Sequence, residues 1–168
     1  MTEILQAGDP APRFEAVDQD GTAVALADFA GRWLLLYFYP RDDTPGCTVE
    51  AQEFTALVAE FAALECDIVG VSPDSPQKHC NFIAKYGLGV RLLADPDRAV
   101  MAPYGAWRLK KNYGREYMGV ARSTFLVAPD GTVARAVAMK QPEADFCSRF
   151  LFSISCSFAT TSIRAMVS

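Results

Sequence analysis

Apolar and polar residues alternate in blocks along this chain, and the blocks predict strands and helices in turn. Residues 33–39 form a continuous apolar run, which is typical of a central strand covered on both faces. From about residue 46 to residue 64, apolar residues recur at helical spacing with glutamate and glutamine between them, which predicts a helix directly after that strand. The pattern therefore predicts a βα unit in this region.

A second unit of the same kind follows. The apolar run at residues 67–72 predicts another buried strand, and residues 75–86 predict a helix that has Gly87 as its stop. A short strand at 91–94 and a short helix around 99–104 come next, with loops after them. The repeated order favours parallel strands joined by helices.

Two pairs of strands complete the pattern. The turn sequence at residues 129–131 separates apolar segments at 123–128 and 132–138 and predicts an antiparallel hairpin. Residues 14–17 and 24–26 predict a smaller hairpin near the N-terminus. Together the elements predict an α/β fold, with a mixed central β-sheet flanked by helices on both faces, compatible with a thioredoxin-like sandwich.

Composition narrows the class of protein. The 168 residues, 51% of them hydrophobic, suffice for one globular core, so residues 1–168 are expected to form a single domain. A net charge of −4 gives no basic face for nucleic acid. Because the N-terminus lacks a secretory pattern and no apolar run approaches the roughly 20 residues of a membrane span, we expect a cytoplasmic protein without a membrane partner.

The cysteines point to redox chemistry rather than to a disulfide framework. There are five, an odd number, and no two of them form a C-x-x-C pair. This disfavours both a secreted disulfide scaffold and a disulfide oxidoreductase of the thioredoxin type. A reduced protein with a transient catalytic disulfide suits the pattern better.

Cys47 is the candidate nucleophile. It follows Pro45 and Gly46 at the predicted start of a helix, directly after the buried strand at 33–39. The unsatisfied N–H groups and the dipole at a helix N-terminus lower the pKa of a cysteine placed there, and the thiolate is the reactive form.

The residues around Cys47 also carry a family resemblance. The spacing of Pro40, Thr44 and Cys47 resembles the signature of the peroxiredoxins, and residues 38–50 are similar to the bacterioferritin comigratory protein subfamily, also called peroxiredoxin Q. Further segments match in the family's order at residues 71–75, 85–88, 92–95 and 122–127. The resemblance covers roughly residues 5 to 138. It implies a monomeric thiol peroxidase that reduces hydrogen peroxide and organic hydroperoxides and is recycled by thioredoxin or a similar dithiol, with no cofactor.

Peroxide chemistry gives each matching residue a role. Cleavage of an O–O bond needs an activated sulfur, donors for the peroxide oxygens and stabilisation of the departing oxyanion. Cys47 would supply the sulfur and Thr44 a hydroxyl for the thiolate and the peroxide. Arg122 would hold the negative charge, Pro40 would shape and shield the loop, and Glu50 would be accessory.

The resemblance offers two positions for the second thiol, the one that forms a disulfide with the oxidised cysteine. Many relatives carry a cysteine five residues after the first, where this chain has Gln52. Others carry it on the next helix, near Ile83, and here Cys80 lies one turn before that position. Cys80 is therefore the best candidate, and a bond to Cys47 would require local unfolding of one or both helices.

The C-terminal segment departs from the resemblance. Residues 140–168 are rich in serine and phenylalanine and poor in charge, where a more charged final helix is expected. The segment is expected to be either an apolar docking segment or a disordered tail. Cys147 or Cys156 within it is an alternative resolving thiol.

Simpler interpretations apply to other residues. Cys66 is expected to be a core residue and His79 a solvated one, which disfavours a cysteine–histidine hydrolase. Asp42 and Asp43 lack the partners of a metal site, so no metal is predicted. Three functions stay open: a two-cysteine peroxidase, a one-cysteine peroxidase, and a peroxide-sensing or chaperone-like binding protein.

Overall fold

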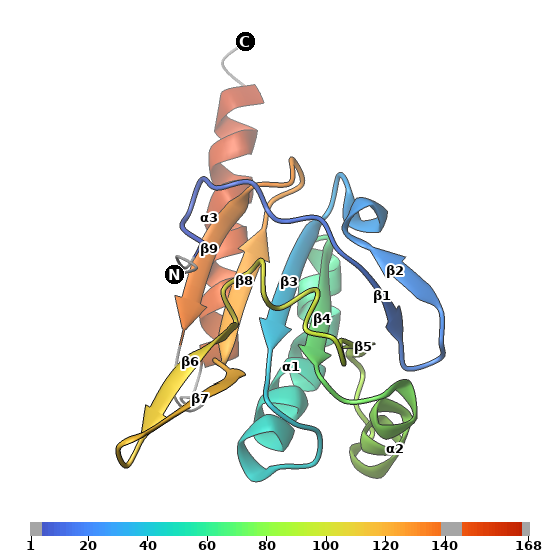
Figure 1. Ribbon diagram of the computed structural model, residues 1–168. Helices are drawn as coiled ribbons and strands as arrows, with labels where there is room; N and C mark the ends of the chain where they lie inside the picture. Colours follow the sequence, from blue (N-terminus) through green and yellow to red (C-terminus); the bar gives the residue numbers. More distant parts are fainter. Residues whose placement is uncertain (1–4, 139–145, 166–168) are drawn as a thin grey trace.

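The computed structural model describes residues 5–138 and 146–165, with the side chains of the last helix described as far as residue 156. Figure 1 shows a twisted sheet with helices packed against it. The elements in chain order are β1 (Glu15–Asp18), β2 (Ala23–Ala25), the 3-10 helix η1 (Leu26–Phe29), β3 (Trp33–Phe38), α1 (Pro45–Ala63), β4 (Cys66–Ser72), α2 (Pro76–Tyr86), β5 (Arg91–Ala94), β6 (Trp107–Asn112), β7 (Arg115–Val120), β8 (Ser123–Val127), β9 (Val133–Ala138) and α3 (Phe146–Ala165).

The main sheet has seven strands in the order β2-β1-β5-β4-β3-β8-β9. The pairs β3–β4 and β4–β5 are parallel, and the other pairs are antiparallel. The sheet is therefore mixed, as the sequence predicts, and both expected hairpins are present. At its centre, residues 34–38 of β3 are buried, in agreement with the continuous apolar run.

The two helices after β3 and β4 begin and end for identifiable reasons. Pro45 occupies the first turn of α1, where its missing N–H costs no hydrogen bond. At α2, the Ser75 hydroxyl accepts a hydrogen bond from the Lys78 amide at 3.3 Å. Gly87 ends α2 in the left-handed conformation, with a φ of +62°.

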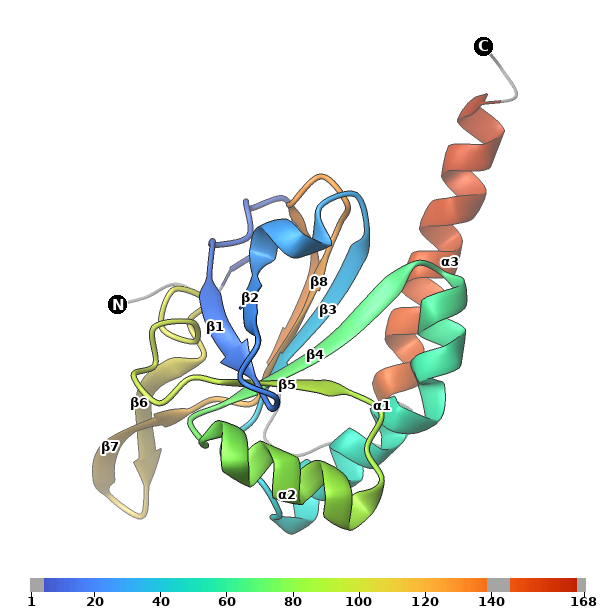
Figure 2. The same ribbon diagram turned by 90° about the vertical axis from the view of Figure 1, so that its right-hand side faces the viewer.

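The two faces of the sheet are covered differently. The three α-helices place their buried aromatic residues, Phe54, Phe82 and Phe150 among them, in one core cluster. Figure 2 shows α1 and α3 side by side on that face. The other face is covered by η1 and by loops. The expectation of helices on both faces is therefore met on this face only by the short 3-10 helix η1.

The expectation of a short helix at 99–104 is wrong. Residues 99–105 form turns, and Arg98 has a φ of +58°, which a right-handed helix does not contain. The Asp95 carboxylate accepts hydrogen bonds from the amides of Val100 and Met101. These hydrogen bonds to a side chain take the place of the backbone hydrogen bonds that the two amides would make in a helix.

The expectation of loops alone after residue 104 is also wrong. Strands β6 and β7 form an antiparallel hairpin separate from the main sheet. Tyr113 and Gly114 both have positive φ values, +50° and +77°, which fits the turn geometry of a two-residue hairpin. The strands are largely exposed, including apolar residues such as Leu109 and Met118, so no alternation of buried apolar and exposed polar residues marks them in the sequence.

The C-terminal segment forms α3 and is not a disordered tail in its described part. Phe146, Phe150 and Ile154 are buried in the core, and their spacing of four residues places them on one face of the helix. Residues 139–145 and 166–168 lie outside the described residues. In the described part of the chain, no helix has the length and apolar character needed to cross a membrane.

The topology places two helix N-termini together. Because β3 and β4 are parallel neighbours, their carboxyl ends meet at one edge of the sheet, at the lower side of Figure 1, and α1 and α2 begin there. This edge holds the candidate nucleophile.

Candidate active site

Cys47 lies in the first turn of α1 and is only 2% exposed. Thr44 is the N-cap residue of α1, but its hydroxyl makes no capping hydrogen bond. It donates instead to the Arg41 carbonyl oxygen at 3.1 Å. The Thr44 side chain therefore leaves the first amides of α1 uncapped, next to the sulfur, where they favour negative charge.

Arg122 reaches the same sulfur from a distant part of the chain. It immediately precedes β8, and Ser123 at the start of β8 pairs with Phe38 at the end of β3. This register brings Arg122 to the edge where α1 begins. Its Nη2 donates to the Cys47 Sγ at 3.1 Å, so a permanent positive charge faces the candidate nucleophile.

The second arm of the guanidinium is bound to Glu50. The Arg122 Nη1 donates to the Glu50 Oε2, and Glu50, one turn after Cys47, is completely buried. The other carboxylate oxygen, Oε1, has no hydrogen-bond partner among the described residues. Glu50 therefore fixes the orientation of Arg122 while its own charge is incompletely compensated.

The electrostatics of this pair follow from burial. Burial raises the pKa of Glu50 to about 7, although Arg122 acts in the opposite direction. Burial also opposes the charge on Arg122, but Glu50 and Cys47 outweigh it and raise the Arg122 pKa above its ordinary value. The guanidinium thus stays charged, and Glu50 gains a proton near neutral pH.

We expect Glu50→Gln to change how stability depends on pH. A carboxyl whose pKa is higher in the folded chain than in the unfolded chain binds more protons when folded. The contribution of protonated Glu50 to the free energy of unfolding is thus fully present below pH 4.5, which is the ordinary pKa of glutamate. It is lost as the pH rises through about 7. Relative to the variant, wild type should lose on the order of 3 kcal/mol of unfolding free energy over that range.

Denaturant titrations at several pH values between these limits measure this difference. Glu60→Gln is the matched control, because Glu60 lies on the same helix and is exposed. Parallel pH profiles for wild type and Glu50→Gln would show that Glu50 does not titrate in this range.

The structure brings some of the predicted site residues together and leaves others apart. Cys47 and Arg122 are in contact, and Thr44 lies in the turn before the nucleophile. Pro40 is exposed just beyond the end of β3. Cys80 is partly buried on α2, and its Sγ lies 2.9 Å from the Gln19 carbonyl oxygen, to which it donates a hydrogen bond.

No disulfide joins any of the five cysteines, all of which lie in the described residues. Cys66 is buried, as expected for a core residue, and burial raises its pKa to about 12. Cys147 is also buried, with its Sγ 3.5 Å from the Glu53 Oε2, and burial followed by the charge of Glu53 raises its pKa well above the ordinary range. Cys156 is exposed on α3.

His79 is not the solvated residue that the sequence suggests. Its ring is completely buried, with Nδ1 2.7 Å from the Asp42 Oδ2 and Nε2 3.0 Å from the Leu93 carbonyl oxygen. The signal in the sequence is its position on α2, because residues 79, 82 and 86 share one face of a helix. A histidine in register with Phe82 and Tyr86 is expected to point inward.

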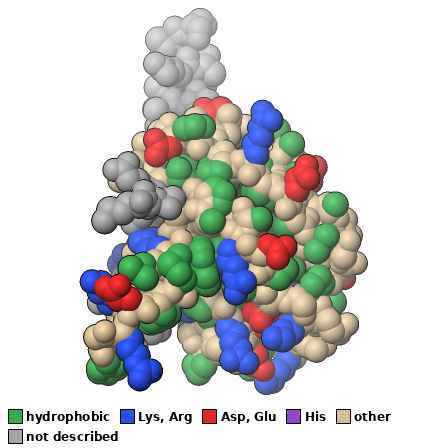
Figure 3. All heavy atoms as spheres, in the orientation of Figure 1, with side chains coloured by type: hydrophobic (Ala, Val, Ile, Leu, Met, Phe, Trp, Pro, Cys, Tyr) green, Lys and Arg blue, Asp and Glu red, His purple; other side chains and the backbone are tan. Residues whose placement is uncertain are grey.

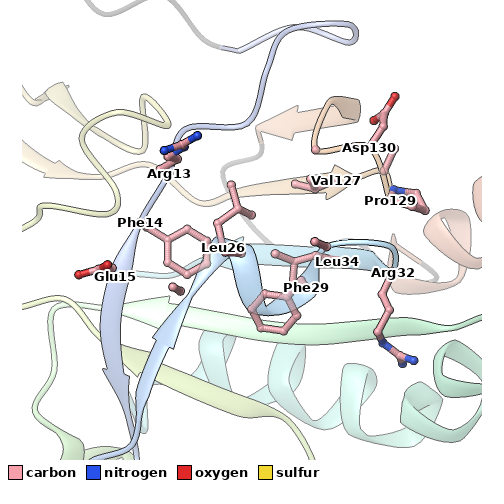
Figure 4. A pocket seen from close by; sticks show the side chains of 15 residues that line it. Arg13, Phe14, Glu15, Leu26, Phe29, Arg32, Leu34, Val127, Pro129 and Asp130 are labelled. Carbon is pink, nitrogen blue, oxygen red and sulfur yellow. The ribbon is translucent and has the colours of Figure 1, made fainter.

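A separate cavity of about 730 Å³ lies far along the sheet from Cys47, near the start of β3. Figure 4 shows Phe14, Leu26 and Phe29 pointing into it, with Pro129 of the β8–β9 turn on the other side. Its lining contains no cysteine, so it is separate from the site around Cys47. In the part of the chain that the structure describes, no three His, Cys, Asp or Glu residues are grouped to hold a metal.

Comparison with known proteins identifies the family. The AhpC/TSA family model matches residues 7–136, most of the chain. The chain is 44% identical to peroxiredoxin Bcp of Bacillus subtilis over 131 residues, which are 78% of this chain and 83% of that one. It is a peroxiredoxin. A second peroxiredoxin Bcp, from Escherichia coli, is 42% identical over 77% of this chain and 83% of its own length.

Solved peroxiredoxin structures have the same fold. Xanthomonas campestris peroxiredoxin Q superposes with a TM-score of 0.80 and 38% identity, covering 85% of this chain and 90% of that one. The fold of this peroxiredoxin is thus thioredoxin-like, as the sequence predicts. Its relatives support a thiol peroxidase activity for the chain.

Proposed function

We propose that Cys47 is the peroxidatic residue of this peroxiredoxin and that the enzyme reduces hydrogen peroxide and organic hydroperoxides. The observation that carries the proposal is the 3.1 Å contact between the Arg122 Nη2 and the Cys47 Sγ at the N-terminus of α1. A Xanthomonas campestris bacterioferritin comigratory protein, 37% identical to this chain, has been studied structurally for its alkyl peroxide reduction activity.

The first step oxidises the sulfur by two electrons. The Cys47 thiolate attacks one oxygen of the hydroperoxide, the S–O bond forms as the O–O bond breaks, and the leaving alkoxide or hydroxide takes up a proton. Arg122 and the first amides of α1 stabilise the negative charge as it passes from sulfur to oxygen. The Thr44 hydroxyl, in the turn before Cys47, contacts the peroxide in this proposal. Pro40, which has no N–H to leave unpaired, shapes the loop.

The second step converts the Cys47 sulfenic acid into a disulfide with Cys80. The Cys80 thiol attacks the Cys47 sulfenic acid, an S–S bond forms and water leaves. Cys66 and Cys147 are less suited to this step because burial raises their pKa values and lowers the thiolate fraction. Cys80 now faces Gln19 of the β1–β2 turn, so α2, the start of α1 or both must open locally.

A dithiol of the thioredoxin type then reduces the Cys47–Cys80 disulfide and is itself oxidised. An intramolecular disulfide requires only one chain, which fits a monomer. We place this cycle in the cytoplasm, where cytosolic reductants keep thiols reduced and can return a transient disulfide to the dithiol state.

Coupled turnover tests the proposal. Thioredoxin, thioredoxin reductase and NADPH are supplied with hydrogen peroxide or an organic hydroperoxide, and NADPH consumption is followed. An enzyme consumes many equivalents of peroxide. Oxidation that stops after one equivalent, with the reductase system intact, would instead indicate a peroxide sensor.

Cys80→Ser is expected to separate the two chemical steps. Oxidation of Cys47 should proceed at the wild-type rate, whereas turnover with thioredoxin should fall strongly because no intramolecular disulfide forms. Mass spectrometry after one equivalent of peroxide should show loss of two hydrogens in wild type and gain of oxygen at Cys47 in the variant. Full turnover by Cys80→Ser would mean that another thiol, or the reductant itself, resolves Cys47.

A further inference from the structure

We propose that His79 is a positioning residue that joins α2 to the loop before Cys47, so that the reactive site and the helix carrying Cys80 open together. The segment of residues 40–44, called the active-site loop here, runs from β3 to α1. This inference rests on the proposed function, because it identifies what holds Cys80 back until Cys47 has reacted with peroxide.

The link is a buried hydrogen-bonded pair. The Leu93 carbonyl oxygen can only accept, so the His79 Nε2 donates to it at 3.0 Å. The remaining nitrogen, Nδ1, lies 2.7 Å from the Asp42 Oδ2. A buried hydrogen bond of this length between a histidine and a carboxylate is one of the stronger contacts available between two segments of a protein.

Asp42 itself is held through both carboxylate oxygens and its backbone amide. In addition to the contact with His79, its Oδ1 accepts a hydrogen bond from the Tyr39 hydroxyl at 2.6 Å. Its amide donates to the Asp74 Oδ2 at 2.8 Å, and the Ser72 hydroxyl donates to that same oxygen. The active-site loop is thus tied both to α2 and to the segment between β4 and α2.

The next residue of the loop adds a second tie to the same helix. Asp43 has a φ of +56°, a left-handed conformation that costs energy for a residue other than glycine. Its carboxylate accepts hydrogen bonds from the Lys85 ammonium group at 2.8 Å and from the Tyr86 hydroxyl at 2.5 Å. Both partners lie at the end of α2, so detaching α2 removes the contacts that hold this conformation.

The interface between the active-site loop and α2 is open to solvent on its outer side. A cavity of about 230 Å³ lies there, lined by residues of the active-site loop and of α2, including Arg41, Asn81 and Lys85. Figure 3 shows Lys and Arg side chains interspersed with Asp and Glu at the lower edge of the molecule, near the start of these helices. Exposed charge pairs contribute little to stability. The buried His79–Asp42 contact is therefore the stronger part of the interface between the active-site loop and α2.

The position of His79 in the sequence makes the link functional. It is adjacent to Cys80, and Asp42 is separated by a single residue from Thr44. While the pair is intact, Thr44 and Cys47 are held for reaction with peroxide, and Cys80 is held toward Gln19. When the pair separates, α2 is released and Cys80 becomes able to reach the oxidised Cys47.

His79→Leu tests the inference, with His79→Asn as the conservative variant that keeps a donor for Asp42. Phe61→Leu is the matched control, because Phe61 is fully buried in the core cluster beneath the three α-helices but lies near the far end of α1 from Cys47. Two quantities are measured. Rapid mixing with hydrogen peroxide, quenched by alkylation, gives the rate constant for Cys47, and amide hydrogen exchange reports the opening of residues 41–50 and 76–86.

We expect His79→Leu to slow the reaction of Cys47 with peroxide by about tenfold, as small displacements of reacting groups do. Exchange should rise in both segments together. The oxidised variant should also form more disulfide and less sulfinic acid than wild type, because Cys80 is released sooner and a second peroxide has less time to oxidise the sulfenic acid. His79→Asn should retain most of the wild-type behaviour, and Phe61→Leu should lower Tm without these changes.

A wild-type rate constant in His79→Leu, or faster exchange in residues 76–86 alone, would overturn the inference. If His79→Leu does not fold, Tyr39→Phe removes one hydrogen bond to Asp42 while keeping the aromatic ring, and the same changes are expected in smaller size. Failure of Cys47 in wild type to react with peroxide would instead contradict the proposed function, so the two failures are distinguishable.

Discussion

Replacing Cys47 with serine is expected to abolish peroxide turnover, with a loss on the order of 10⁴-fold or more. The reaction oxidises the sulfur atom itself, and a serine hydroxyl supplies neither a thiolate nor a stable oxidised form. Because Cys47 is buried and serine is similar in size, the fold should persist. The measurement is NADPH consumption with thioredoxin, thioredoxin reductase and hydrogen peroxide.

Cys156→Ser provides the control for general effects of removing a thiol. Cys156 is exposed on α3, whereas Cys47 is buried at the start of α1. Because the proposed cycle resolves Cys47 through Cys80, turnover of Cys156→Ser should remain at the wild-type level, and a loss would instead assign the resolving step to Cys156. Circular dichroism and Tm should be compared for both variants. Appreciable turnover by a folded Cys47→Ser protein would show that another cysteine is the nucleophile.

The parts of the fold that the sequence predicts well are those whose burial is visible in a single segment. The run at 33–39 is apolar throughout because β3 is covered on both faces, and β3 is buried as expected. The helix starts at Pro45 and Pro76 follow local rules of capping and backbone geometry. The exposed hairpin β6–β7 carries no such signal, because its strands pack little of their surface against the core.

The site shows the same division. Cys47 and Thr44 lie on one short segment, so their spacing predicts their proximity. The pairing of Arg122 with the sulfur depends on strand register between β8 and β3, and the sequence indicates it only through the family resemblance. The contact between His79 and Asp42 joins residues 37 apart in the chain. A lone histidine on a polar stretch gives no indication of its partner.

The C-terminal segment is instructive because its helical pattern is present in the sequence. Phe146, Phe150 and Ile154 recur every four residues, which is helical spacing. The low charge of the same segment points instead to a docking segment or a disordered tail, and the two signals conflict. Packing against α1 explains the apolar residues on the buried face of α3, whereas Phe152, which is 72% exposed, shows that the low charge extends to the outer face.

Arg122→Met is expected to lower the rate constant for reaction of Cys47 with hydrogen peroxide by about 10²- to 10³-fold, the usual effect of removing one donor aimed at developing negative charge. Methionine keeps much of the apolar volume but cannot donate to the Cys47 Sγ. Arg122→Lys should recover only part of the rate, because an ammonium group does not reproduce the fork that reaches both the sulfur and Glu50. Rapid-quench kinetics of the reduced enzyme measure this step directly.

The double variant Arg122→Met/Glu50→Gln separates catalysis from stability. Arg122→Met alone leaves Glu50 completely buried without its cation, so the free energy of unfolding of this variant should fall. The neutral amide introduced by Glu50→Gln should restore part of that free energy. The rate constant should not recover, because the donor to the sulfur is still absent. Recovery of the rate together with stability would instead mean that Arg122 serves mainly to compensate Glu50, and that the amides of α1 alone stabilise the reacting charge.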